Sequence, residues 1–128
     1  MSQFVLDASA VLALLSREKG WEEVEQAIAM GAAISTVNVA EVVSKLSDTG
    51  MPETAIGQVL DLLGLEIVDF NRSLAHNTGM LRPHTKHRGL SLGDRACLAL
   101  AGTRNLPALT TDRAWEHLQL DVTIQLIR

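Results

Sequence analysis

The sequence has too few cysteines for internal disulfide bonds and no recognisable export signal. One cysteine among 128 residues, Cys97, excludes an internal disulfide framework, and it lies in the apolar stretch 96–100, where a free thiol behaves as a small hydrophobe. The longest apolar run, 10–15, is too short to span a bilayer, and the amino terminus lacks a basic region ahead of an apolar one. We therefore expect a cytoplasmic protein that forms a single domain over residues 1–128.

Aromatic residues and basic charge are also scarce. There is no tyrosine and there are only two Phe and two Trp, so an aromatic platform for stacking nucleic-acid bases is not expected. The net charge of −4 argues against non-specific coating of nucleic acid, although a local basic patch can still hold RNA or DNA. The four histidines form no pair at a recognised zinc spacing, and the stretch 89–93 lacks the lysine of a Walker loop.

Short strand-like runs alternate with longer helical ones, which is the pattern of an α/β domain with a parallel sheet. The expected strands are 3–6, 32–35, 65–68, 107–110 and 122–126. The expected helices, taken from apolar residues at helical spacing and from breakers at the ends, are 8–16, 21–30, 37–48, 53–63, 71 to before Pro83, 91–104 and 113–118. We predict a central parallel sheet of about five strands flanked by helices, an α/β/α sandwich.

Four acidic residues lie where an apolar run ends or a helix begins: Asp7, Glu41, Asp94 and Asp112. In a parallel sheet these points gather at one edge, where ligands of open α/β sheets bind. Clustered carboxylates repel one another, so such a group persists only if cations neutralise it or some members take up protons. Hard oxygen ligands suit Mg²⁺ or Mn²⁺, so the pattern predicts a divalent-metal site, with one ion or two left open.

Each acidic residue also has a structural explanation. Asp7 and Asp112 can cap the helices that follow them, and Asp94 stands three residues after Ser91 in the pattern of a capping box. Glu41 lies beside an apolar stripe, where most glutamates are simply solvated. The expected convergence of all four at one sheet edge favours the metal site.

Divalent ions held by carboxylates can activate a water molecule, clamp phosphate oxygens and stabilise a leaving oxygen, which are the requirements of phosphodiester hydrolysis. No protein nucleophile is then needed. We expect metal-activated water to attack in line and to leave a 5′-phosphate and a 3′-hydroxyl.

A basic segment precedes Asp94. Residues 83–89 have the composition of a loop, and the cations around it and the next helix start are Arg82, Lys86, Arg88 and Arg95. Phosphate contacts of this kind position a strand without reading its bases, so we predict that these residues bind RNA. The alternative is a solvated loop.

The same residues carry a family resemblance. Asp7-Ala8-Ser9 after the first strand, Glu41 soon after the second, Asp94 opening a late helix, and Thr110-Thr111-Asp112 after the next strand resemble the PIN-domain ribonucleases. Among these the chain most resembles the small VapC-type toxins of prokaryotic toxin–antitoxin pairs. The resemblance runs from residue 5 to the carboxyl terminus.

This resemblance implies a Mg²⁺- or Mn²⁺-dependent endoribonuclease that forms a homodimer and is inhibited by a cognate antitoxin, whose carboxyl-terminal segment covers the active site. The residues that it assigns to the metal and to catalysis are Asp7, Glu41, Asp94 and Asp112, with Ser9, Thr110 and Asn38 as supporting groups.

Two other interpretations stay open. A catalytically silent PIN-like or receiver-like module would use the acidic pocket for binding, but a receiver needs a lysine after a late strand, where residues 110–113 have none. A metal-dependent phosphatase needs an Asp-x-Asp pair, and Ser9 takes the second position after Asp7. The nuclease interpretation is therefore preferred, although the sequence does not name the RNA.

Overall fold

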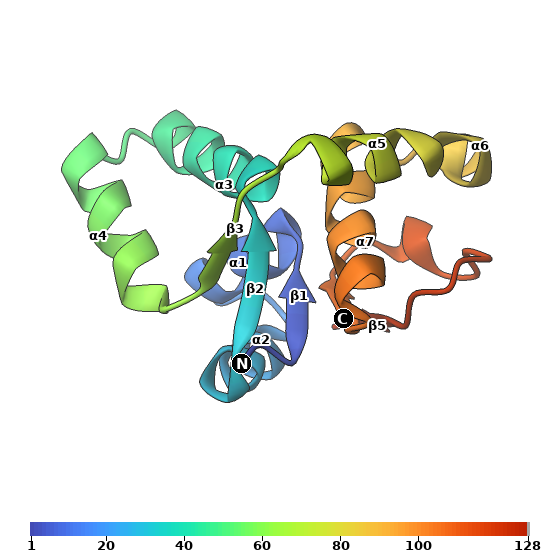
Figure 1. Ribbon diagram of the computed structural model, residues 1–128. Helices are drawn as coiled ribbons and strands as arrows, with labels where there is room; N and C mark the ends of the chain where they lie inside the picture. The colour runs from blue at the N-terminus through green and yellow to red at the C-terminus, as the bar shows by residue number, and fades with distance from the viewer. Residues whose placement is uncertain (128) are drawn as a thin grey trace.

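The computed structural model describes residues 1–127, which form a five-stranded parallel sheet. The strands are β1 (Phe4–Leu6), β2 (Ala32–Ser35), β3 (Glu66–Val68), β4 (Ala108–Thr110) and β5 (Ile124–Leu126), in the order β3-β2-β1-β4-β5 (Figure 1). Every neighbouring pair is parallel, so all strands end at the same edge. The predicted α/β sheet is confirmed, with most strands one or two residues shorter than expected.

Successive side chains of each strand lie on opposite faces of the sheet, and each face packs into its own hydrophobic cluster. Leu6 and Leu109 belong to the first cluster, whereas their neighbours Val5 and Ala108 belong to the second. This is the consequence of the two-residue period of a strand. Both faces are therefore covered, as expected for a parallel sheet.

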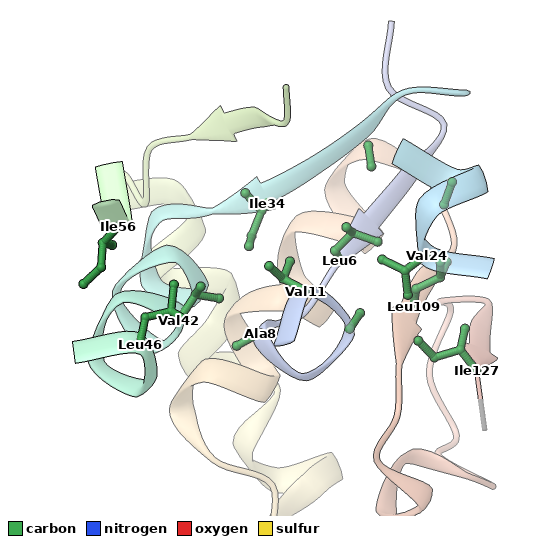
Figure 2. Close-up of a cluster of buried hydrophobic side chains, with 13 residues drawn as sticks. Leu6, Ala8, Val11, Val24, Ile34, Val42, Leu46, Ile56, Leu109 and Ile127 are labelled. Atoms are coloured by element: carbon green, nitrogen blue, oxygen red, sulfur yellow. The ribbon is translucent and has the colours of Figure 1, made fainter. Parts of the chain in front are cut away.

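The first cluster is covered by the helices of the amino-terminal half. These are α1 (Ala8–Leu15), α2 (Trp21–Met30), α3 (Thr36–Asp48) and α4 (Glu53–Leu63). Figure 2 shows how Val11 of α1 and Val42 of α3 lie among the strand residues Leu6 and Ile34. Helix α1 follows β1 directly and is apolar on most sides, which is why it packs deepest.

The second cluster is covered by α5 (Arg72–Met80) and α7 (Leu92–Arg104), which lie on the opposite side of the sheet from α4 in Figure 1. Helix α7 contributes Cys97, Leu98 and Leu100, all buried, so the lone thiol is a core residue as expected. No helix within residues 1–127 is both long and apolar enough to cross a membrane.

Two local predictions were wrong. Residues 83–89 are mostly helical, since α6 (Arg82–Thr85) and a single 3₁₀ turn, η1 (Lys86–Arg88), occupy the segment expected to be a loop. Pro83 sits in the first turn of α6, where its missing N–H costs no hydrogen bond. The last expected helix, 113–118, is only the 3₁₀ turn η2 (Arg113–Trp115).

Candidate metal and nucleic-acid site

All four predicted acidic residues line one cavity of about 400 Å³ at the carboxyl edge of the sheet. The strand order reverses at β1, whose end carries Asp7, and β2 and β4 flank it on either side. Glu41 comes from α3, Asp94 from the first turn of α7, and Asp112 from just beyond β4. The predicted convergence is what the structure shows.

Asp7 is the most constrained carboxylate of the cavity. Its side chain is 3% exposed. Oδ1 accepts hydrogen bonds from the Ala10 N–H at 2.8 Å and the Ser9 hydroxyl at 2.7 Å, and Oδ2 accepts one from the Thr110 hydroxyl at 2.6 Å. Burial raises the pKa of Asp7 to about 6, against the opposing effect of those hydrogen bonds and with a further contribution from the charge of Asp94.

The supporting hydroxyls bind the ends of β1 and β4 together. Ser9 Oγ accepts a hydrogen bond from the Thr111 N–H at 3.0 Å, and Thr110 Oγ1 accepts one from the Asp112 N–H at 3.0 Å. Each hydroxyl therefore donates a hydrogen bond to Asp7 and accepts one from a backbone N–H just beyond β4. The orientation of Asp7 is fixed from two sides, which gives Ser9 and Thr110 a structural role at this site.

Asp94 both caps a helix and lines the cavity. Its Oδ2 accepts from the Ser91 N–H at 2.9 Å while Ser91 Oγ accepts from the Asp94 N–H at 3.1 Å, so the expected capping box is present. Burial raises the pKa of Asp94, and the nearby charge of Asp112 adds to this while Arg95 opposes it. Asp112 caps in turn, accepting from the Ala114 N–H at 2.9 Å. The structural and functional explanations are thus compatible.

Glu41 is held against α7 by Asn38. The Asn38 Nδ2 donates to Glu41 Oε1 at 2.8 Å and to the Gly93 carbonyl at 3.0 Å, and both partners are acceptors, which fixes the orientation of the amide. Asn38 is fully buried, and its Oδ1 finds no donor within residues 1–127. A Cβ on Gly93 would lie 2.5 Å from Glu41 Cδ, so a side chain at this position would require the Glu41 carboxylate to shift.

The donors fit a hard divalent cation by their chemistry. Four carboxylates face one cavity, two of them with a raised pKa, and the Glu41 carboxylate lies directly against Gly93. In this conformation, no three Asp, Glu, His or Cys side chains of the described chain come close enough together to hold one metal ion. The carboxylates therefore surround a cavity without closing around a single point.

The predicted basic residues lie outside the cavity wall. Arg82, Lys86 and Arg88 are exposed on α6 and η1, and Arg95 is partly buried, with its Nε donating to the Ser91 carbonyl at 3.3 Å. The cation that does line the cavity is Lys45. It follows Glu41 by one helical turn, and that spacing was the signal in the sequence that could have found it.

The parallel sheet and the four carboxylates at its edge define an α/β domain with an acidic cavity, and comparison with known proteins assigns the family. A family model described as PIN domain matches residues 4–120. The chain therefore belongs to the PIN domain family, as its four acidic motifs predicted. No curated protein matches the sequence.

Solved structures with the same fold include a DNA-bound VapBC from Salmonella typhimurium, 21% identical over 100% of both chains, with a TM-score of 0.78. VapBC-1 from nontypeable Haemophilus influenzae is 17% identical over 96% of both chains, with a TM-score of 0.71. PAE2754 from Pyrobaculum aerophilum is 17% identical over 96% of this chain and 90% of its own, with a TM-score of 0.62. At these identities the similarity establishes a shared fold.

Proposed function

We propose that the protein is a Mg²⁺- or Mn²⁺-dependent endoribonuclease and the toxin of a VapBC-type toxin–antitoxin pair. The observation that carries the proposal is the burial of Asp7 at the point where the strand order reverses, in one cavity with Glu41, Asp94 and Asp112. A carboxylate with a raised pKa and a specific charged neighbour in a cleft is typical of a functional site.

Asp7, Glu41, Asp94 and Asp112 are the residues that would hold the cation. A bound divalent ion supplies charge neutralisation and water activation for phosphodiester hydrolysis. The chain itself supplies orientation. Fixed partners hold all four: Asp7 by hydroxyls and a backbone N–H, Glu41 by Asn38, and the two remaining carboxylates by their own helix caps. These partners orient the carboxylates toward the cavity, and binding of one cation by three of them would require the side chains to move closer together.

The RNA backbone would approach along the exposed surface of α6 and η1. Arg82, Lys86 and Arg88 are exposed there, and Arg95 lies at the start of α7 beside Asp94. We propose that they bind phosphates of the strand while its reacting phosphodiester enters the acidic cavity.

The proposed partners are a second copy of the chain and an antitoxin. One structure of the same fold is described as a toxin–antitoxin complex from Klebsiella pneumoniae, and VapBC-5 from Mycobacterium tuberculosis is described as a member of the VapBC family of toxin–antitoxin systems. These descriptions support an antitoxin for this chain as well. Exposed apolar side chains on α4 and β3, Leu62 and Ile67, support a homodimer surface. Val59 and Leu60 of the same helix pack against the first hydrophobic cluster.

The test is cleavage of structured and single-stranded RNAs by the antitoxin-free protein in Mg²⁺, Mn²⁺ or EDTA. Wild-type protein should cleave only with metal, and Asp94→Asn should abolish cleavage while its circular dichroism spectrum is retained. Activity in EDTA would contradict metal dependence. Inactivity of the wild type together with undiminished RNA binding would favour the alternative, a catalytically silent module that binds through the acidic pocket.

A further inference from the structure

Helix α3 presents a polar stripe to the cavity. Glu41, Ser44, Lys45 and Asp48 all line the cavity wall, and their spacing places them on one face of the helix. The opposite face carries the apolar side chains that pack against the first hydrophobic cluster, Val42 and Leu46 being buried. Among the residues of the described chain, 1–127, that line this cavity, Lys45 is the only one with a positive charge.

The ordinary explanation for Lys45 is an ion pair with Glu41, four residues earlier, which is a favourable order on a helix. The structure shows a different arrangement. The Glu41 carboxylate accepts a hydrogen bond from Asn38, one turn in the other direction, and lies against Gly93 of α7. No carboxylate within residues 1–127 comes within 4.0 Å of the Lys45 ammonium, that of Asp48 included.

An acidic cavity of this kind repels a polyanion, so a phosphodiester needs a compensating charge at the wall. Lys45 is exposed, has no ion-pair partner within residues 1–127 and lines the cavity wall. Exposed Arg82, Lys86 and Arg88 instead lie outside the cavity on α6 and η1. A lysine ammonium is a compact charge with three donors on a flexible stem, which suits contact with phosphate oxygens.

We propose that Lys45 is a phosphate-positioning residue, whose ammonium contacts the RNA phosphate that enters the cavity or the one next to it. This inference rests on the proposed ribonuclease function. It adds a specific cationic contact from α3 to the contact proposed for Arg95 of α7. Removal of the charge should weaken RNA binding and its salt dependence while leaving the carboxylates in place.

The experiment compares wild type, Lys45→Gln, Lys45→Arg and Lys19→Gln. Lys19 is exposed in the turn between α1 and α2 and does not line the cavity, so its variant controls for the loss of one positive charge. Fluorescence anisotropy with a labelled single-stranded RNA in Ca²⁺, over a series of salt concentrations, measures binding. Single-turnover cleavage in Mn²⁺ measures the KM-against-kcat split.

Lys45→Gln should weaken binding about tenfold, the loss of one charge-assisted hydrogen bond, and should reduce the log–log salt slope by about 0.7. The effect should appear mainly in KM. Lys45→Arg should restore the slope, and Lys19→Gln should match wild type.

Two results overturn the inference while leaving the proposed function intact. Wild-type cleavage together with an unchanged affinity and slope in Lys45→Gln would show that Lys45 touches no phosphate. A slope in Lys45→Arg as low as that in Lys45→Gln would show that charge is not the cause. If wild type neither binds nor cleaves RNA, the proposed function falls, and the role of Lys45 falls with it.

Discussion

Replacement of Asp7 with asparagine should stabilise the metal-free protein, and the gain should grow with pH. Asp7 is buried and its pKa is raised from the ordinary 3.8 to about 6. Asparagine resembles the protonated acid in size and keeps an oxygen for the Ala10 N–H, and it is an equally good N-cap. Its amide can donate to the Thr110 hydroxyl, which then accepts where it formerly donated.

The magnitude follows from linkage between proton binding and folding. The pKa of Asp7 is higher in the folded protein than in the unfolded chain. Between pH 3.8 and about pH 6 the folded protein therefore binds more protons than the unfolded chain, and the stability of the wild type falls as pH rises through this range. At 1.36 kcal/mol per unit of pKa, the contribution of Asp7 falls by about 3 kcal/mol once pH exceeds the folded pKa. The variant has no such group, so its advantage should rise from about 1 kcal/mol at pH 4.5 to about 3 kcal/mol at pH 7.5.

Urea denaturation in EDTA at the two pH values measures this difference. Excess Mn²⁺ at pH 7.5 should narrow or reverse the advantage, because a ligand that binds the folded state stabilises the wild type more than a variant with a weakened cation site. If the free energy of unfolding of the variant is about 1 kcal/mol lower than that of the wild type at both pH values, the reasoning is refuted. That result is expected from loss of a helix cap and not from removal of a buried charge.

Three further outcomes are expected. Gly93→Ala should displace the Glu41 carboxylate and impair metal-dependent cleavage, and its change in stability should be less favourable than that of Gly57→Ala, which has open space around its Cβ and should stabilise by up to about 1 kcal/mol. Equal changes in cleavage rate and in the free energy of unfolding for the two variants would contradict this. Replacement of Lys86 and Arg88 by glutamine should flatten the salt dependence of RNA binding by about 0.7 for each phosphate that is no longer bound, and an unchanged slope would place the RNA elsewhere. Inhibition by a basic antitoxin tail should weaken as Mg²⁺ is raised, if its cation replaces the metal charge; insensitivity to Mg²⁺ would indicate that the partner only blocks entry.

The sheet and the convergence of the carboxylates were predictable because both follow from local patterns. Strand residues such as Val5 and Leu6 alternate between two buried faces, and the resulting apolar runs are distinct from the helical spacing that follows them. Once the strands are parallel, every acidic residue that follows a strand must lie at one edge. For Asp94 the structural and functional interpretations did not compete, because the hydrogen bonds of the helix cap also orient its carboxylate at the cavity.

The remaining features could not be predicted from hydrophobic periodicity. Gly93 looks like a helix residue of low propensity until the Glu41 carboxylate is found against it. Lys45 looks like the partner of Glu41 until Asn38 is found to hold that carboxylate instead. The segment 83–89 looks like a loop because basic residues and a proline carry no helical stripe, although Pro83 is well suited to a first helical turn.

The hydroxyl contacts between β1 and β4 have a consequence for synthesis of the chain on the ribosome. Thr110 donates to Asp7 across a separation of 103 residues, and β4 pairs directly with β1 in the middle of the sheet. Domains generally fold as units during synthesis, and this pair of strands cannot form until β4, which ends at Thr110, has been added. A nascent chain that has completed β1, α3 and α7 still lacks Asp112 at the cavity and the Thr110 hydroxyl that binds Asp7 Oδ2. The order of synthesis thus delays assembly of the acidic centre until most of the protein has been translated.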